Sequence, residues 1–247
     1  MTITGQLHSG KAVLCLPPLF EEMNLARAVI GRQAQYFAAR GLPTCVLDYY
    51  GTGDSEGNTD SATAQIWLDD ILAVGDWLRQ NGIQEIVFWG VRFGGLLLLH
   101  FQSTLHDALP VQRQLLWKPV LGGKLHINQF LRLKQASSML HGGTEKVNWR
   151  QRIAEGDRVE VAGYPLSESL ISSIETLAVP SDFTPASHIS WLELGTSVIT
   201  PAVQRVVGFS PAGQYHLEAM DTPLFWQIPE TFTVPALYSR SLAMLVE

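Results

Sequence analysis

The sequence has little of what marks several large classes of protein. Only 2 of its 247 residues are cysteine, Cys15 and Cys45, and both lie in apolar runs typical of buried strands. We therefore expect reduced core thiols and not the disulfide framework of a small secreted protein. Basic residues are also scarce, with 17 against 23 acidic ones and a net charge of -6. Such a chain lacks a basic field for phosphates, so we expect no nucleic-acid partner.

Long hydrophobic runs and metal-ligand patterns are missing as well. The apolar stretches are shorter than the roughly 20 residues that a membrane-spanning helix needs. Residues 1–10 lack the basic start and apolar centre of a secretion signal. The 7 histidines form no i, i+4 pair and no Cys/His cluster. We expect no transmembrane segment, a cytoplasmic location, no metal site and no other cofactor.

What the sequence does have is a 46% share of hydrophobic residues and a regular alternation of strand and helix patterns. Asn24 is expected to cap a helix that ends at Gly41, and a second amphipathic helix is expected over residues 61–80. This order predicts an α/β fold with a mostly parallel sheet and helices on both faces. Buried strands are predicted at residues 12–16, 44–48, 85–89, 112–117, 189–194 and 214–220, and a final helix at residues 235–246.

The turn after the third of these strands is the most informative stretch. Residues 89–95 read Trp-Gly-Val-Arg-Phe-Gly-Gly, which is the frame of a nucleophile elbow, G-x-S-x-G, with Arg92 where the nucleophile belongs. Gly90 and Gly94 supply the clearance that the sharp turn needs. The leucines at residues 96–99 continue as a buried helix. The scaffold of a hydrolase is therefore present with a different residue at its centre.

Taken together, these patterns resemble the α/β-hydrolase superfamily. The features are a turn rich in Gly, Asp and Ser at residues 50–57, the elbow, and an irregular segment after the next strand. From about Ala12 onward the chain is similar to the exosortase A system-associated hydrolase 2 family. The residues that carry this likeness are 17–24, 48–57, 66–70, the elbow with Arg92, 116–120 and 225–227.

The resemblance implies an α/β-hydrolase fold and, by family name, a hydrolase of the ester type. It also implies partners in an exopolysaccharide and protein-sorting system. The chain starts almost directly at the strand of residues 12–16. We therefore expect reduced N-terminal edge strands and a sheet smaller than the usual eight strands.

The irregular segment, residues 119–186, is interpreted as a cap inserted into a core of residues 1–118 and 187–247. Within it the patterns predict a helix at residues 127–140, a turn at 141–143, a short strand at 158–162 and a helix at 167–177. In a sheet-based hydrolase, a cap at this point of the chain grows over the active site.

The standard Ser-His-Asp triad does not fit this sequence at any of its three positions. Arg92 has no proton to give and stays charged at working pH. The loop of residues 195–201 contains no acid, and Glu193 lies earlier, within the strand. The loop of residues 221–226 contains no histidine, and His216 also falls within a strand. The catalytic residues are thus unknown, and Ser55, a nearby hydroxyl, is expected to tie its own loop together.

Two roles for Arg92 are open. At a helix N-terminus, its guanidinium is suited to hold a carboxylate or a phosphate. Alternatively, Glu21 or Glu22 from the loop after the first strand pairs with Arg92 and fills the old active site with a salt bridge.

The remaining candidate pocket residues surround this elbow. Asn24 lies beside the glutamates in sequence, and Phe93, Phe225 and Trp226 are expected to line the cavity from the opposite side. Backbone N–H groups of Leu19 and Phe93 are the candidates for oxyanion-type donors.

Three functions compete. The first is a pseudoenzyme that binds a ligand, an anionic small molecule or a sugar derivative, or a protein partner of the exopolysaccharide and protein-sorting system. The second is a hydrolase or transferase with non-standard chemistry, in which Glu21 or Glu22 acts as base and Arg92 stabilises a developing anion. The third is a structural subunit whose surface carries the function.

Overall fold

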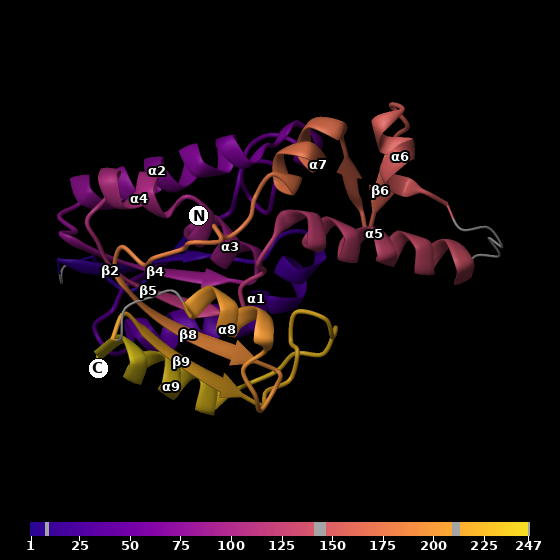
Figure 1. Ribbon diagram of the computed structural model, residues 1–247. Coiled ribbons are helices and arrows are strands. Elements are labelled where there is room, and N and C mark those ends of the chain that lie inside the picture. Colours follow the sequence, from indigo (N-terminus) through magenta and orange to yellow (C-terminus); the bar gives the residue numbers. More distant parts are fainter. Residues whose placement is uncertain (8–9, 141–146, 209–212, 247) are drawn as a thin grey trace.

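A computed structural model describes residues 1–7, 10–140, 147–208 and 213–246. Within these residues a seven-stranded sheet has the order β1-β3-β2-β4-β5-β8-β9 (Figure 1). Only β1 runs antiparallel to its neighbour, and the other pairings are parallel. The strands are β1 (Thr2–Thr4), β2 (Lys11–Leu16), β3 (Thr44–Val46), β4 (Glu85–Val91), β5 (Val111–Trp117), β8 (His188–Leu194) and β9 (Tyr215–Met220).

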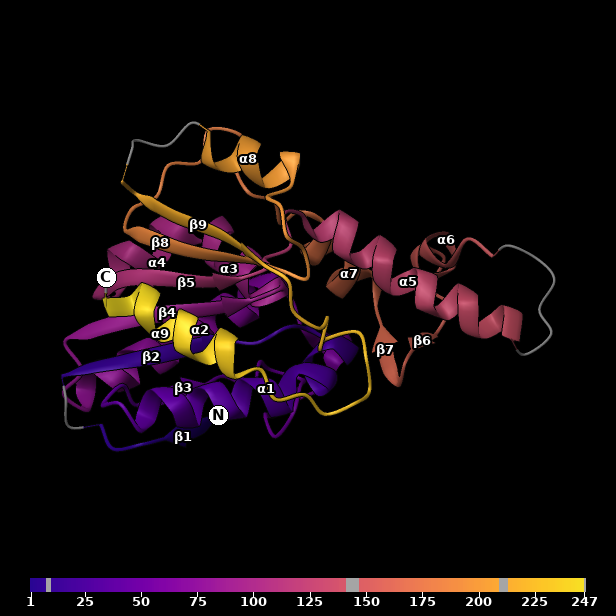
Figure 2. The same cartoon turned by 90° about the horizontal axis from the view of Figure 1, so that it is seen from below.

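Helices cover both faces of the sheet because the central strands are apolar on both sides. On one face, Val13 and Val87 pack against α1 (Glu21–Ala38) and α9 (Pro235–Val246). On the other face, Leu14 and Phe88 pack against α2 (Ala64–Gln80), α3 (Phe93–His100) and α4 (Gln102–Ala108). Figures 1 and 2 show these two helical layers. A short 3-10 helix, η1 (Thr59–Ser61), precedes α2, and α8 (Pro201–Val207) follows β8.

The segment between β5 and β8 leaves the sheet at the carboxyl ends of the strands. Its long helix α5 (Gly123–Leu140) extends outward, and the other elements gather around it (Figures 1 and 2). A Cβ on Gly123 would lie 1.7 Å from the carbonyl oxygen of Ile174, so only glycine lets α5 pass this close to α7. The other elements are α6 (Trp149–Ala154), the hairpin β6 (Val159–Val161) and β7 (Tyr164–Leu166), and α7 (Glu168–Glu175).

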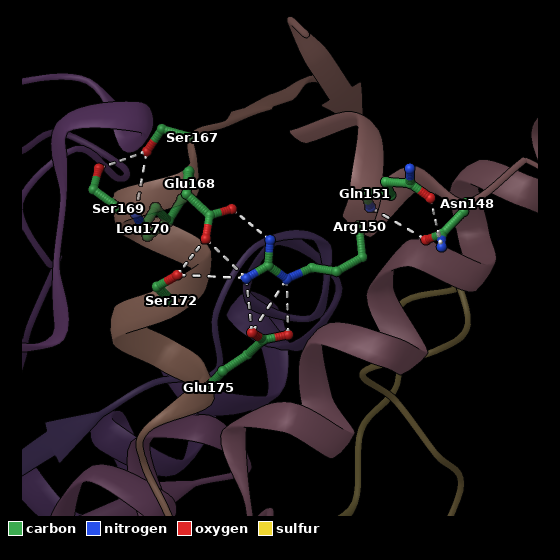
Figure 3. A network of polar contacts seen from close by, with 9 residues as sticks. All are labelled: Asn148, Arg150, Gln151, Ser167, Glu168, Ser169, Leu170, Ser172 and Glu175. Carbon is green, nitrogen blue, oxygen red and sulfur yellow. Dashed lines mark hydrogen bonds and ion pairs between the residues drawn. The ribbon is translucent and has the colours of Figure 1, made fainter. Parts of the chain in front are cut away.

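An arginine fastens this segment to itself. Arg150 on α6 donates to both carboxylate oxygens of Glu175 and to both of Glu168, the two acids lying on α7 (Figure 3). Ser172, between them, adds a weaker contact at 3.4 Å. The paired carboxylates raise the pKa of Arg150, and the arginine lowers the pKa of Glu168. The cluster holds the short helix α6, which has few buried side chains of its own, against α7.

The α/β fold with a mostly parallel sheet, helices on both faces and a reduced N-terminal edge, predicted from the sequence, is confirmed. Several details were wrong or missed. Asn24 is not the N-cap, because α1 already begins at Glu21 and Phe20 precedes it with a φ of 58°. The strand predicted at residues 44–48, β3, ends at Val46, and the helix predicted from residue 61, α2, starts only at Ala64. The short elements α6, β7 and α8 were not foreseen, and the turn at residues 141–143 lies outside the described residues.

Candidate functional site

The elbow keeps its geometry with an arginine at its centre. Arg92 links the end of β4 to the start of α3 with φ 54° and ψ −111°. A non-glycine residue in such a conformation costs about 1–3 kcal/mol and persists only where its surroundings enforce it. Gly94 leaves room for the sharp turn, since a Cβ at that position would lie 2.0 Å from the carbonyl oxygen of Leu16. The close approach of β2 and α3 therefore requires the glycine frame that the sequence indicated.

The side chain of Arg92 is held by three groups. Its Nε donates to Oε2 of Glu22 at 3.1 Å, and its Nη2 donates to Oε1 at 3.0 Å. Nη1 donates to the carbonyl oxygen of Lys118 at 3.1 Å, and the guanidinium lies 5.1 Å from the ring centre of Trp226. The arginine side chain is only 10% exposed and that of Glu22 only 19%. Of the two glutamates proposed as partners, the structure pairs Glu22 with Arg92, and Glu21 accepts a bond from Asn24 instead.

A second ion pair lies at the next strand. Lys118, directly after β5, bonds through its ammonium group to Glu193 of β8. The Glu193 carboxylate, 3% exposed, also accepts the indole N–H of Trp191 at 3.2 Å. Glu193 is the acid closest to the position where a triad would place one. Its carboxylate is engaged by a lysine and an indole and does not orient a histidine.

The other residues considered for catalysis form contacts that do not assemble a triad. His216 lies within β9, where its Nε2 is 2.8 Å from Nη2 of Arg240. The Ser55 hydroxyl donates to the carbonyl oxygen of Asp48 at 2.6 Å, as expected for a residue that ties its loop. The loop after β9, where a triad histidine would stand, supplies Trp226 to the face of Arg92.

A cavity of about 540 Å³ opens between α1, α5 and the loop after β9. Of the residues expected around the site, Leu19, Glu21, Glu22 and Trp226 line it. Its wall is completed by Leu25, His126, Gln129, Phe130, Arg132, Leu133 and Gln227.

Four expected pocket residues do not line it. Arg92 is one of them, with its guanidinium bonded to Glu22 in the wall. Phe93 and Phe225 are fully buried and do not line this cavity, because both pack into the hydrophobic clusters of the sheet. Asn24 faces away from it, and its side-chain amide donates to the hydroxyl of Tyr164 at 2.9 Å. Phe93 is the first residue of α3, so its N–H has no partner within the helix. A donor role for it and for Leu19 stays a prediction.

The sequence reasoning missed His126, which lines the cavity from α5. Its ring stacks on Phe20 at 6.3 Å and lies 5.2 Å from the ring of Phe93. Burial lowers the pKa of His126 to about 4, with Glu22 raising it and Arg92 lowering it. The signal was available: a helix that begins at Gly123 places His126 on the same inner face as Phe130. Because the helix was predicted to begin only at residue 127, this histidine was left outside it.

Among the described residues, no three His, Cys, Asp or Glu side chains gather where a metal ion would need them. No helix in the described ranges is long and apolar enough to cross a membrane.

Solved structures are similar to this chain over nearly its whole length. No family model and no curated protein matches it by sequence. A putative hydrolase from Agrobacterium vitis S4 is 15% identical, with a TM-score of 0.64 over 98% of this chain and 91% of that one. The chain has the α/β-hydrolase fold. Est1E from Butyrivibrio proteoclasticus, solved with ferulic acid, is 16% identical, with a TM-score of 0.64 and coverage of 100% and 95%.

An enol-lactonase from Burkholderia xenovorans LB400 is 14% identical, with the same TM-score of 0.64 and coverage of 100% and 95%. At such low identity, the likeness establishes the fold. The function has to be argued from the residues of the site.

Proposed function

We propose that this chain is an α/β-hydrolase-like protein of the exosortase A and exopolysaccharide-associated type that has lost the Ser-His-Asp triad and binds a ligand or partner without catalysis. The observation that carries the proposal is the bidentate pair of Arg92 and Glu22 at the elbow. A guanidinium keeps its proton at working pH and cannot attack a carbonyl. Glu22 neutralises it with both oxygens, so the former nucleophile position is filled by a closed ion pair.

The positions of the other triad members support the same proposal. The acid nearest to the expected place, Glu193, is engaged by Lys118. The loop where a histidine would stand contributes Trp226, whose indole has no general-base nitrogen. A serine hydrolase needs all of these groups in mutual hydrogen-bond contact.

The ligand-binding part of the proposal concerns the cavity beside the elbow. We propose that residues 119–186 act as a cap over a core of residues 1–118 and 187–247, and that the cavity below α5 takes an anionic small molecule or a sugar derivative. Trp226 supplies an aromatic surface and Arg132 a cation to its wall. The family resemblance supports protein partners in an exopolysaccharide and protein-sorting system.

Activated esters test the loss of catalysis. We expect the purified chain to release p-nitrophenol from p-nitrophenyl acetate and butyrate no faster than buffer does. We expect the same of Arg92→Ser, because a serine placed at the elbow would still lack its base and acid. Turnover by the unaltered chain well above buffer, abolished by Arg92→Met, contradicts the proposal.

A second candidate is a hydrolase or transferase with non-standard chemistry. One observation favours it: Glu21 and His126 line the same cavity as Glu22, a short distance from Arg92. Within the described residues Glu21 accepts one hydrogen bond, from Asn24, whereas both oxygens of Glu22 are bonded to Arg92, so Glu21 is the better base of the two glutamates. If an activity is found, this candidate expects Glu21→Gln to abolish it without lowering the melting temperature. An activity unchanged by both Glu21→Gln and Glu22→Gln excludes this version.

A further inference from the structure

Two buried polar side chains in the wall of the cavity lack hydrogen-bond partners. Within the described residues, neither Nδ1 nor Nε2 of His126 has one, and the same holds for Nε1 of Trp226. His126 is 4% exposed and Trp226 is 2% exposed, and both line the cavity between α1 and α5. Buried polar groups in folded proteins are nearly always hydrogen-bonded, because leaving them unpaired carries the full loss of their hydration. Three unpaired nitrogens around one cavity therefore point to a molecule that pairs with them.

The charge of Arg92, behind Glu22 in the cavity wall, is already balanced. Glu22 and the carbonyl of Lys118 occupy three donors of Arg92. An anion entering here would have to compete with Glu22 and lie beside its carboxylate. Burial also keeps the imidazole of His126 neutral at pH 7, since its pKa is lowered to about 4. An uncharged ligand is not repelled by the Glu22 carboxylate.

The rest of the lining combines aromatic faces and neutral hydrogen-bonding groups with one acid, Glu21, and one base, Arg132, whose formal charges cancel. Trp226 and Phe130 supply the rings, and Gln129 and Gln227 supply amides that both donate and accept. The volume of about 540 Å³ lies within the range of ordinary small-molecule sites, about 300–1,000 Å³. A ring with one apolar face and several hydroxyl groups matches such a wall.

We propose that this cavity binds an uncharged polyhydroxylated ring, a pyranose sugar, and that His126 and Trp226 are its recognition residues. The neutral imidazole accepts a hydrogen bond from one hydroxyl and donates to another oxygen, and the indole N–H donates to a third. Since these nitrogens lie just under the cavity wall, binding includes a rotation of the two side chains toward the ligand. The inference rests on the proposed ligand-binding function and selects the sugar over the anionic small molecule.

Calorimetric titration of the full chain tests this inference. The probes are the methyl α-glycosides of glucose, galactose and mannose, with glucuronate and galacturonate as charged comparators. We expect at least one methyl glycoside to bind, and to bind more tightly than its uronate. His126→Phe keeps the aromatic stack and removes both nitrogens, so it should weaken binding about tenfold or more. Trp226→Phe should weaken it several-fold.

A matched control is His188→Phe. His188 also has an unpartnered buried Nδ1, but it lies at the start of β8 and does not line the cavity. This variant should bind the glycoside as the unaltered chain does. If His126→Phe does not fold, the imidazole ¹⁵N signals of the unaltered chain provide the measurement, since those of His126 should shift on adding the glycoside and those of His188 should not.

The inference is overturned if no methyl glycoside binds, if only the uronates bind, or if a glycoside binds equally to His126→Phe. These outcomes are separate from the ester assay. Release of p-nitrophenol from esters contradicts the proposed loss of catalysis and leaves glycoside binding as measured. Absence of glycoside binding contradicts the sugar site and leaves the ester result unchanged.

Discussion

Two arginines of this chain, Arg92 and Arg150, form ion pairs with glutamates, one in a buried site and the other in a partly exposed one. Arg92 at the elbow meets one carboxylate, Glu22, and its side chain is 10% exposed. Arg150 in the segment after β5 meets two carboxylates, Glu168 and Glu175, and is 29% exposed (Figure 3). Arg150 makes more hydrogen bonds, but water already solvates its partners in part. Burial, more than the number of bonds, should decide how much each cluster matters to the fold.

The comparison also separates two structural tasks. The Arg92 pair joins α1 to the turn between β4 and α3, residues 70 positions apart in the chain, inside the packed core. The Arg150 cluster joins α6 to α7, both within the inserted segment. Loss of the first leaves a charge in the core, whereas loss of the second loosens one edge of the insertion.

The largest effect is expected from Glu22→Gln. It leaves the guanidinium of Arg92 buried without a counter-charge, and breaking a buried pair in this way costs about 3–5 kcal/mol. Urea unfolding followed by circular dichroism should show this loss in the free energy of unfolding. Glu21→Gln, one residue earlier and outside the pair, is the control and should change it by less than about 1 kcal/mol. Equal losses of unfolding free energy in Glu22→Gln and Glu21→Gln would contradict a special role for the pair with Arg92.

Lowering the pH should reduce the free energy of unfolding through His126. Its folded pKa of about 4 lies below the ordinary histidine pKa of 6.5, so between these values the unfolded chain binds a proton that the folded chain does not. Stability from this residue is complete above pH 6.5 and decreases as pH falls toward 4. Between pH 7 and pH 4.5 the loss is about 2 kcal/mol. His126→Phe lacks this titration, so its free energy of unfolding should fall by about 2 kcal/mol less than that of the unaltered chain over the same interval. Urea unfolding at the two pH values measures the difference. Parallel curves for the two proteins would contradict this.

Arg150→Gln should have a smaller effect. Because its partners are partly solvated, we expect a loss of about 1 kcal/mol. Screening at about 1 M salt should reduce this difference, while the loss in Glu22→Gln should persist there. Thermal melts at low and high salt provide the comparison. A loss in Arg150→Gln as large as that in Glu22→Gln would show that burial is not the deciding factor.

The smallest effect is expected from replacing both members of the buried pair. Arg92→Met combined with Glu22→Met removes both charges and retains most of the side-chain volume. Replacement of a buried pair by apolar residues is often neutral or stabilising, so the double variant should lie within about 1 kcal/mol of the unaltered chain in urea unfolding. A loss as large as that of Glu22→Gln would mean that the pair itself, and not its imbalance, supports the elbow.

Much of the fold was predictable because its signals are local. The strands ending at Leu16, Val91 and Trp117 are short apolar runs bounded by turns, and the helix over residues 235–246 has the bounds that its pattern indicated. Short polar elements were not predictable in this way. Helix α6 has one buried residue, Ile153, so it has no apolar period to detect and is held by Arg150 instead.

Parts of the site were less accessible to sequence reasoning. Asn24 looked like a helix cap by residue type, but the strained backbone of Phe20 starts α1 earlier, and only the packed loop holds that conformation. An error of four residues in the start of α5 concealed His126. The pair of Lys118 and Glu193 joins two strands that are neighbours only after folding.

Sequence alone dictates the elbow: two glycines at the required spacing, an apolar strand before them and Arg92 between them. It also offers Glu21 and Glu22 as partners of Arg92, beside the alternative of an anionic ligand. The choice between them belongs to the tertiary structure. Consecutive residues on a helix point about 100° apart, so the way α1 lies against the sheet turns Glu22 toward Arg92. Glu21 points elsewhere and bonds to Asn24, three residues further along the same helix.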